Sequence, residues 1–123
     1  MEPKPILVVD DSMNILVTVA KALEILGHPV EVTAYAEEAL QRLSRTEYAL
    51  VLLDLELWGI SGLEMLRRLR GRGMETPVII ITAYANPENE AEARDLGAID
   101  FIPKPFTPYE LRERVARVLE RSV

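Results

Sequence analysis

Three carboxylates, a hydroxyl and an amine follow four apolar runs in this sequence. Asp10 and Asp11 follow ILVV, Asp54 follows ALVLL, Thr82 follows PVIII and Lys104 follows AIDFIP. A carboxylate can attack phosphorus to form an acyl phosphate, a metal ion and a lysine can neutralise the phosphoryl oxygens, and a hydroxyl can bond one of them. These residue types therefore favour phosphoryl chemistry, provided that the fold brings them together.

Each of these residues alone has a plainer interpretation. Asp10, Asp11 and Ser12 could merely cap a helix that follows them. A lone Thr82 is typical of a strand, and a lone Lys104 is typical of a solvated loop. The functional hypothesis depends on finding all of the reactive side chains after four different strands, because chance agreement of that kind is improbable.

Five apolar segments predict the strands that would position these residues. Segments 5–9, 49–53 and 77–81 are continuously hydrophobic, as strands covered on both faces of a parallel sheet are. Segments 30–35 and 98–102 alternate between apolar and polar residues, which indicates edge strands with one wetter face. The pattern predicts three central strands and two edge strands.

Helical patterns separate these strands. Hydrophobic residues recur at helical spacing in the segments 15–26, 39–43, 63–69 and 111–119. Helix starts are predicted at the capping residues Ser61, Asn86 and Thr107, the second of them opening a helix to about residue 96. Helix ends are predicted at Gly27, at Gly71 or Gly73, and at Gly97.

The alternation predicts an α/β fold of the (βα)5 type in a single domain over residues 1–123. Right-handed crossovers and the edge assignments favour a parallel sheet of order 2-1-3-4-5 with helices on both faces. The chain direction then reverses between the first and third strands, where sites form beyond the carboxyl ends. Asp10, Asp11 and Asp54 would crowd together there, and a hard divalent cation such as magnesium would compensate their charge.

The composition excludes several other classes of protein. A net charge of −6, from 14 basic and 20 acidic residues, argues against direct nucleic-acid binding by this domain. The chain has no cysteine, which fits a reducing compartment. No apolar stretch is long enough to span a membrane and no secretory signal is present, so we expect a cytoplasmic protein without a membrane contact.

The sequence resembles the receiver domains of two-component response regulators. The resemblance runs from ILVVDDS through LVLLDLELWGISGLE and PVIIITAYA to LGAIDFIPKPF and the last helical segment. It implies a flavodoxin-like three-layer sandwich in which a sensor histidine kinase, or a phosphotransfer protein, phosphorylates Asp54. It also implies that Asp11, Asp54 and the backbone carbonyl of Glu56 bind magnesium or manganese, while Asp10 acts largely through water.

The resemblance further implies a switch. Thr82 matches the family's switch hydroxyl, Lys104 its phosphoryl-binding lysine, and Phe101 the aromatic residue that moves inward with the hydroxyl. Phe101 stands where Tyr is frequent, and a phenyl ring has no hydroxyl that would favour an outward, hydrated position. A plain core role for Phe101 remains an alternative, and the Lys104-Pro105 bond matches a cis bond of the family.

Three residues near Asp54 are candidate modulators of the phosphoryl group. Glu56 could direct its carboxylate toward the metal, Lys104 or an attacking water, or simply face solvent. Tyr84 lies two residues after Thr82 and would border the same entrance. Trp58 stands where the family usually has Pro, and could contact a partner or merely cover the crevice.

Three classes of function remain open. The first is a signalling switch that relays phosphorylation through the fourth helix, fifth strand and fifth helix, and that is an enzyme only in limited self-phosphorylation and self-dephosphorylation. The second is a haloacid dehalogenase type phosphatase, for which Glu56 has the right charge but which lacks a cap domain. The third is an FMN-binding domain, which the acidic DDSMN loop disfavours.

The resemblance leaves the output of such a switch open. An output domain in a longer chain, or a separate downstream protein, could receive the signal. A homodimer could also form on the helix 4 to helix 5 face through Arg94, Asp100 and Arg114, for which ordinary solvation is the alternative.

Overall fold

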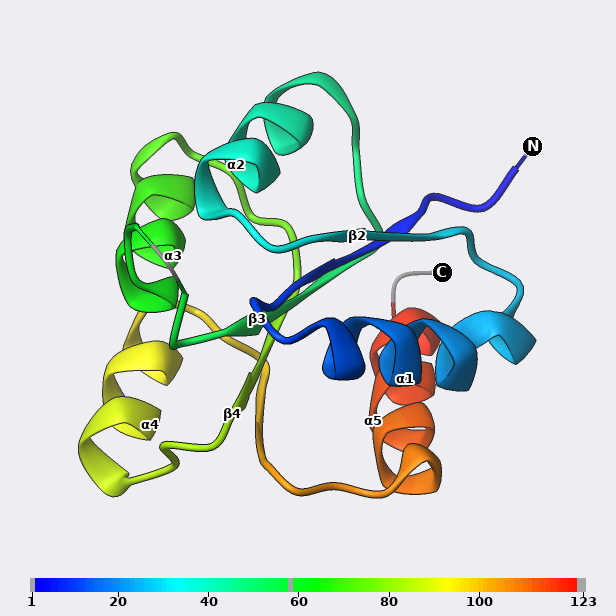
Figure 1. Cartoon of the computed structure of the whole chain (residues 1–123). Coiled ribbons are helices and arrows are strands. Elements are labelled where there is room, and N and C mark those ends of the chain that lie inside the picture. Colours follow the sequence, from blue (N-terminus) through cyan, green and yellow to red (C-terminus); the bar gives the residue numbers. More distant parts are fainter. Residues whose placement is uncertain (1, 58, 122–123) are drawn as a thin grey trace.

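The strands and helices alternate along the whole chain (Figure 1). The computed structural model describes residues 2–57 and 59–121, and within them five strands and five α-helices are found. The strands are β1 (Ile6–Val9), β2 (Val30–Thr33), β3 (Leu50–Asp54), β4 (Val78–Thr82) and β5 (Asp100–Pro103). The helices are α1 (Met13–Leu23), α2 (Ala36–Arg45), α3 (Gly62–Gly71), α4 (Pro87–Asp95) and α5 (Pro108–Arg121), with a 3-10 helix, η1 (Glu24–Leu26), after α1.

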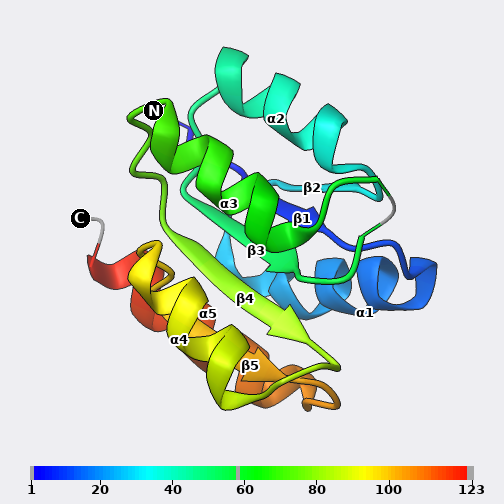
Figure 2. The same cartoon turned by 90° about the vertical axis from the view of Figure 1, so that its left-hand side faces the viewer.

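The strands form one parallel sheet with helices on both faces. Their order is β2-β1-β3-β4-β5, which confirms the predicted (βα)5 sandwich. Figure 2 shows α2, α3 and α4 on the near face of the sheet and α1 and α5 on the far face. The reversal between β1 and β3 places their carboxyl ends side by side.

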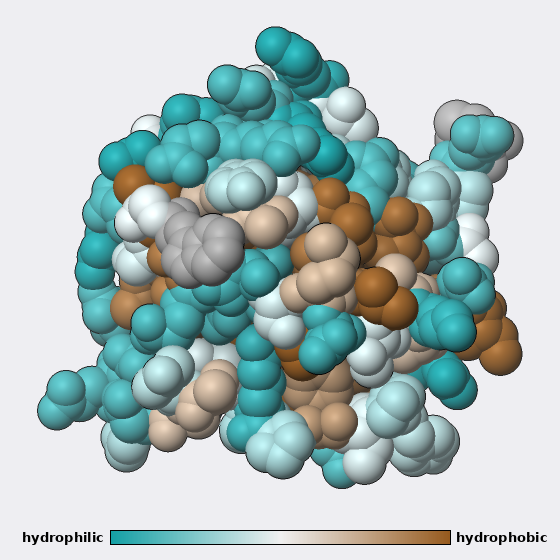
Figure 3. All heavy atoms as spheres, viewed as in Figure 1, coloured by the Kyte–Doolittle hydropathy of each residue, from teal (hydrophilic) through white to brown (hydrophobic). Residues whose placement is uncertain are grey.

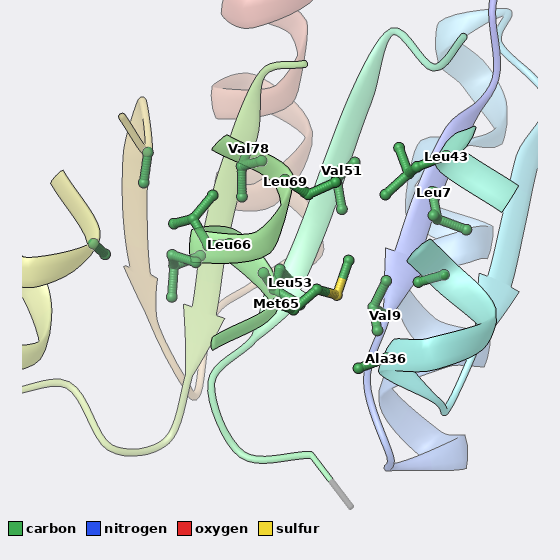
Figure 4. Packing of buried hydrophobic residues seen from close by; sticks show 14 of the residues in the cluster. Leu7, Val9, Ala36, Leu43, Val51, Leu53, Met65, Leu66, Leu69 and Val78 are labelled. Atoms are coloured by element: carbon green, nitrogen blue, oxygen red, sulfur yellow. The ribbon is translucent and has the colours of Figure 1, made fainter. Parts of the chain in front are cut away.

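The sheet separates two hydrophobic cores. Consecutive strand residues point to opposite faces, so a strand covered on both sides must be apolar throughout. Figure 4 shows part of the core on the face covered by α2 and α3, where Met65 of α3 lies beside Leu53 of β3. Ile6 and Val8 of β1 instead belong to the core under α1 and α5. This arrangement explains the continuously hydrophobic runs at β1, β3 and β4.

The observed boundaries refine the predicted ones. Asp54 and Thr82 are the last residues of β3 and β4, so the strands deliver these side chains directly. Gly73, with φ +76°, adopts the left-handed conformation just after α3, while Gly71 is still helical. Leu26 lies in η1 and no longer in α1. The predicted caps are confirmed, since the side chains of Ser61, Asn86 and Thr107 each accept a backbone N–H three residues on.

Helix α4 is attached to the domain mainly by polar contacts. Ala93 is its only buried residue. Beyond its C-terminal end, the Arg70 side chain of α3 donates to the carbonyl oxygens of Leu96 at 2.8 Å and Gly97 at 3.3 Å. Burial lowers the pKa of this guanidinium, which also donates to two carbonyls of the α3–β4 loop. Arg70 therefore fixes the C-terminal end of α4.

The surface is largely hydrophilic on the face seen in Figure 3. Hydrophobic side chains gather there over α1 and β2, where Val17, Ile25 and Val32 are exposed. Of the helices that the structure describes, none combines the length and the apolar character needed to cross a bilayer.

Candidate functional site

The predicted reactive side chains meet at the carboxyl edge of the sheet. The strand register pairs Val9 with Leu53 and Thr82 with Pro103, so the strands end close to one another. Asp10 and Asp54 are buried beside the partly buried Asp11, and one carboxylate oxygen from each lies within 4.8 Å of the others. The expected acidic cluster is therefore present in the folded chain.

Lys104 joins the two buried carboxylates. Its ammonium donates to Asp10 Oδ2 at 2.8 Å and to Asp54 Oδ2 at 3.0 Å. Burial alone would lower the pKa of Lys104, but these hydrogen bonds outweigh it and raise the pKa. The Lys104 backbone N–H donates to the carbonyl of Thr82 at 2.8 Å, and the Lys104-Pro105 bond is cis. The β5–α5 loop thus delivers one cation into the acidic cluster.

Asp54 is a buried carboxylate with few compensating contacts. Burial raises its pKa, against the Glu56 backbone N–H and Lys104, which both stabilise the charged form. The Glu56 N–H donates to Asp54 Oδ1 at 3.2 Å. A single lysine facing three carboxylates leaves an excess of negative charge at the cluster, which a bound cation would offset.

The donor set fits a divalent cation that prefers oxygen ligands. Both carboxylate oxygens of Asp10 are engaged, Oδ1 by the Ser12 N–H at 2.9 Å and Oδ2 by Lys104. The Asp11 carboxylate, in contrast, has no hydrogen bond or ion pair within residues 2–57 and 59–121. Both carboxylate oxygens of Asp54 are likewise engaged, by the Glu56 N–H and by Lys104, so Asp11 is the member of the cluster with free carboxylate oxygens for a cation among the described residues.

Of the two residues predicted to switch, Thr82 is the last residue of β4 and Phe101 lies within β5. The Thr82 hydroxyl is buried and accepts the Tyr84 N–H at 3.0 Å. No hydrogen bond joins Thr82 to Asp54 among the described residues. Phe101 is 5% exposed and packs within the core under α2 and α3. The aromatic ring therefore lies inward in this structure.

The candidate modulators Tyr84 and Glu56 have side chains exposed to solvent near the site. Tyr84 is 61% exposed beside Thr82. The Glu56 side chain is exposed, and no ion pair joins it to Lys104 in the part of the chain described. The structure brings the Glu56 backbone to Asp54 and leaves its side chain in solvent. Trp58 lies outside the described residues.

Comparison with known proteins shows the family. The model of the response regulator receiver domain matches residues 6–116. The chain belongs to this family. The receiver domain is 38% identical to an uncharacterised transcriptional regulatory protein, YkoG, of Bacillus subtilis. The match covers 99% of this chain and 54% of YkoG. It is 42% identical to the two-component response regulator PhoP of Pseudomonas aeruginosa, in a match that covers 78% of this chain and 43% of PhoP.

Solved structures agree with this assignment. A CheY-like receiver domain protein from Methanospirillum hungatei superposes with a TM-score of 0.89 at 33% identity, over 97% of this chain and 95% of that one. The BeF3-activated receiver domain of DrrB superposes with a TM-score of 0.86 at 36% identity, over 97% and 99% of the two chains. The receiver domain spans about half the length of the curated relatives it matches. It is a signalling domain of two-component systems.

Gly62 is a site residue that sequence reasoning missed. A Cβ atom at Gly62 would lie 2.1 Å from the backbone oxygen of Asp54 and 2.8 Å from the Cα of Leu55. The Gly62 N–H donates to the Leu55 carbonyl at 3.0 Å. The only signal in the sequence was its place in SGLE, which predicted the cap at Ser61 and gave no hint that β3 and α3 touch here.

Replacing Lys104 with methionine should destabilise the metal-free receiver domain. The change leaves Asp10 and Asp54 buried without their cation, and breaking a buried ion pair typically costs about 3 kcal/mol of unfolding free energy. Urea unfolding in the presence of a chelator measures the loss. The control is Lys21→Met, which removes an exposed lysine of α1 and should change stability by less than about 0.5 kcal/mol. Equal losses in both variants would contradict the assigned role of Lys104.

Proposed function

We propose that this receiver domain is a switch that accepts a phosphoryl group on Asp54 from a sensor histidine kinase or a phosphotransfer protein, in the cytoplasm. The observation that carries the proposal is the meeting of Asp54, Lys104 and the two other carboxylates at one sheet edge. An Asp54 oxygen attacks phosphorus, the new O–P bond forms, and the P–N bond of the phosphohistidine donor breaks with protonation of the leaving imidazole. Lys104 then pairs with the phosphoryl oxygens.

The reaction is proposed to depend on magnesium or manganese. Asp11, Asp54 and the backbone carbonyl of Glu56 would hold the ion, and Asp10 would act largely through water while its oxygens accept from the Ser12 N–H and from Lys104. The ion supplies positive charge that offsets the carboxylates and the incoming phosphoryl oxygens. Asp10 meanwhile keeps the Lys104 ammonium directed toward Asp54.

Phosphorylation would shift an equilibrium between two arrangements of the output face. In the proposed active arrangement the Thr82 hydroxyl donates to a phosphoryl oxygen, and the inward Phe101 ring accompanies it. The change would pass to α4, β5 and α5 and from there to an output domain of a longer chain, or to a separate protein. Two relatives named as transcriptional regulatory proteins, YkoG and PhoP of Bacillus subtilis, match this chain over about half of their length.

A homodimer on the same face is a further part of the proposal. Arg114 pairs with Asp100 at 3.3 Å, and Arg94 pairs with Glu90 at 3.0 Å, all within one chain. These exposed or half-buried pairs have a small net worth. They could therefore be exchanged for pairs across a dimer at little cost.

The test is incubation with acetyl phosphate and magnesium, followed by intact-mass measurement and peptide mapping. We expect one phosphoryl group per chain on the peptide containing Asp54, and none when a chelator removes the metal. Beryllofluoride with magnesium should bind at the same site. Rapid release of many phosphate equivalents per chain, without accumulation of a phosphorylated chain, would instead indicate a haloacid dehalogenase type phosphatase and would overturn the proposal.

Removing the charge of Glu56 should speed phosphorylation by small anionic donors. A carboxylate near the entrance repels an approaching dianion by about 0.4 kcal/mol in water, so Glu56→Asn should raise the rate with acetyl phosphate about twofold at low salt. High salt should reduce the effect. Glu24→Asn makes the same charge change on exposed η1 and should leave the rate unchanged. If Glu56→Asn alters neither phosphorylation nor dephosphorylation, the modulating role assigned to Glu56 and Tyr84 is wrong.

A further inference from the structure

Tyr84 links the two ends of the loop between β4 and α4. Residues 83–86 of this loop are exposed. Tyr84 nevertheless has both backbone polar groups engaged by side chains. Its N–H donates to Thr82 Oγ1 at 3.0 Å, and its carbonyl accepts from the side-chain amide of Asn89 at 3.0 Å. The Tyr84 backbone therefore links the buried hydroxyl of Thr82 to the first turns of α4.

The two ends of α4 are attached in different ways. Arg70 binds the chain just beyond the C-terminal end through two carbonyls. At the N-terminal end, Asn86 caps the helix and Asn89 reaches back to the loop. Ala93 is the buried residue within α4, and Leu96, which packs against the same core, lies just beyond its C-terminal end. The N-terminal end therefore depends on polar contacts to the Thr82 loop.

We propose that Asn89 is a positioning residue that holds Thr82 in the arrangement seen here. As long as Asn89 holds the Tyr84 carbonyl, the Tyr84 N–H stays in place and retains the Thr82 hydroxyl. The Thr82 oxygen accepts from Tyr84 and keeps its own proton free to donate, so the cost lies in displacement: if Thr82 Oγ1 moves toward Asp54 and away from the Tyr84 N–H, one of these two hydrogen bonds is lost. The inference rests on the proposed function, because the group that Thr82 would move toward is a phosphoryl group on Asp54.

The hydrogen bond from Asn89 to the Tyr84 carbonyl should stabilise one of the two proposed arrangements more than the other. The Asn89 hydrogen bond is present while Thr82 is not bonded to Asp54, so it favours the arrangement before phosphorylation. A hydrogen bond of this kind contributes a net free energy that corresponds to about a threefold change in an equilibrium constant. Loss of the Asn89 side chain should shift the population toward the active arrangement by about that factor.

The first experiment needs no phosphoryl group. Asn89→Ala in the whole chain should speed amide hydrogen exchange at Tyr84 about threefold, because the residue is held only through Thr82 Oγ1 after the change. NMR measures the exchange rate residue by residue. Asn89→Asp removes the donor but keeps the side-chain shape, and should act in the same direction. An unchanged exchange rate at Tyr84 in both variants would overturn the inference.

Asn86→Ala is the matched control. It removes the cap that accepts the Asn89 backbone N–H at 2.8 Å but leaves the Asn89 side chain in place. This change destabilises the start of α4, whereas Asn89→Ala raises helix propensity. A general loosening of α4 would thus appear in Asn86→Ala and not in Asn89→Ala. If Asn86→Ala speeds exchange at Tyr84 as much as Asn89→Ala does, the inference fails.

The second experiment is a titration with beryllofluoride in magnesium. The half-saturating concentration should fall about threefold in Asn89→Ala and should not fall in Asn86→Ala. An unchanged or higher value in Asn89→Ala would overturn the inference. A wild-type domain that fails to bind beryllofluoride would instead refute the proposed function, while the exchange experiment would still decide whether Asn89 positions Tyr84.

Discussion

Replacing Asp54 with asparagine is expected to abolish phosphoryl uptake and, in the absence of metal, to stabilise the fold. An amide oxygen is not a nucleophile toward acetyl phosphate, so intact-mass measurement should show no phosphoryl group. The same change removes one of three carboxylates that lie within 4.8 Å of one another. Asparagine avoids the burial of a charged carboxylate and also its repulsion by the other two, so the free energy of unfolding should rise by about 1 kcal/mol at neutral pH.

The pH dependence of the stability gives the sign of this effect. Burial raises the pKa of Asp54, so the folded domain binds the proton more tightly than the unfolded chain does. The wild-type domain therefore gains stability as the pH falls through the raised pKa of Asp54. The advantage of Asp54→Asn, measured by urea unfolding with a chelator present, should be largest near neutral pH and should disappear on acidification.

Magnesium should make the wild-type domain more stable than Asp54→Asn. Binding to the folded state alone stabilises a protein, and the variant lacks one of the proposed ligands. Thermal unfolding with increasing magnesium should thus raise the midpoint of the wild type more than that of Asp54→Asn. Asp95→Asn, an exposed change near the end of α4, should retain full phosphoryl uptake. Residual uptake in Asp54→Asn, or a stability loss that persists without metal, would contradict the assigned role of Asp54.

Gly62→Ala should cause the largest loss of stability among single methyl additions to this domain's helices. The new Cβ would lie 2.1 Å from the Asp54 carbonyl oxygen, which is backbone and cannot turn aside. Either the start of α3 or the end of β3 must shift, at a cost of about 3 kcal/mol or more. Urea unfolding measures this cost, and the displaced Asp54 should also take up phosphoryl groups more slowly.

Gly71→Ala provides the control in the same helix. A Cβ built on Gly71 meets nothing within 4 Å beyond its chain neighbours and the backbone of its own helix, among the described residues, and Gly71 is helical. Alanine should therefore stabilise α3 by about 0.5 to 1 kcal/mol. If Gly→Ala lowers the free energy of unfolding at Gly62 and raises it at Gly71, the close approach of Gly62 to the backbone of Asp54 determines the loss, and not the removal of a glycine as such. A loss below about 1 kcal/mol in Gly62→Ala would contradict this account.

The fold could be predicted from the sequence because its signals are local and agree with one another. Continuous apolar runs identify β1, β3 and β4, and the caps Ser61, Asn86 and Thr107 mark where helices begin. The end of α3 could not be assigned to one glycine from the sequence, because Gly71 and Gly73 can both adopt a left-handed conformation, and in the structure only Gly73 does so. Leu26 keeps helical spacing but lies in a tighter 3-10 turn.

The site could be predicted only as far as strand topology carries it. The carboxyl ends of four strands share one edge of the sheet, and the predicted reactive residues lie at or just after these ends: Asp10, Asp11, Asp54, Thr82 and Lys104. The contacts of Arg70, Gly62 and Asn89 join segments through backbone carbonyls, which have no signature in the side-chain pattern. Residue types and their periodicity therefore indicate the chemistry, while the supporting contacts require coordinates.

The shallow packing of α4 has a consequence for the thermodynamics of signalling. A helix that buries only Ala93 can shift without exposing much apolar surface to water. Heat-capacity changes scale with the apolar area that becomes hydrated. A rearrangement of α4 should therefore carry only a small heat-capacity change. The free-energy difference between the two proposed arrangements of α4 should then vary almost linearly with temperature, whereas the free energy of unfolding, which exposes both cores, should be strongly curved.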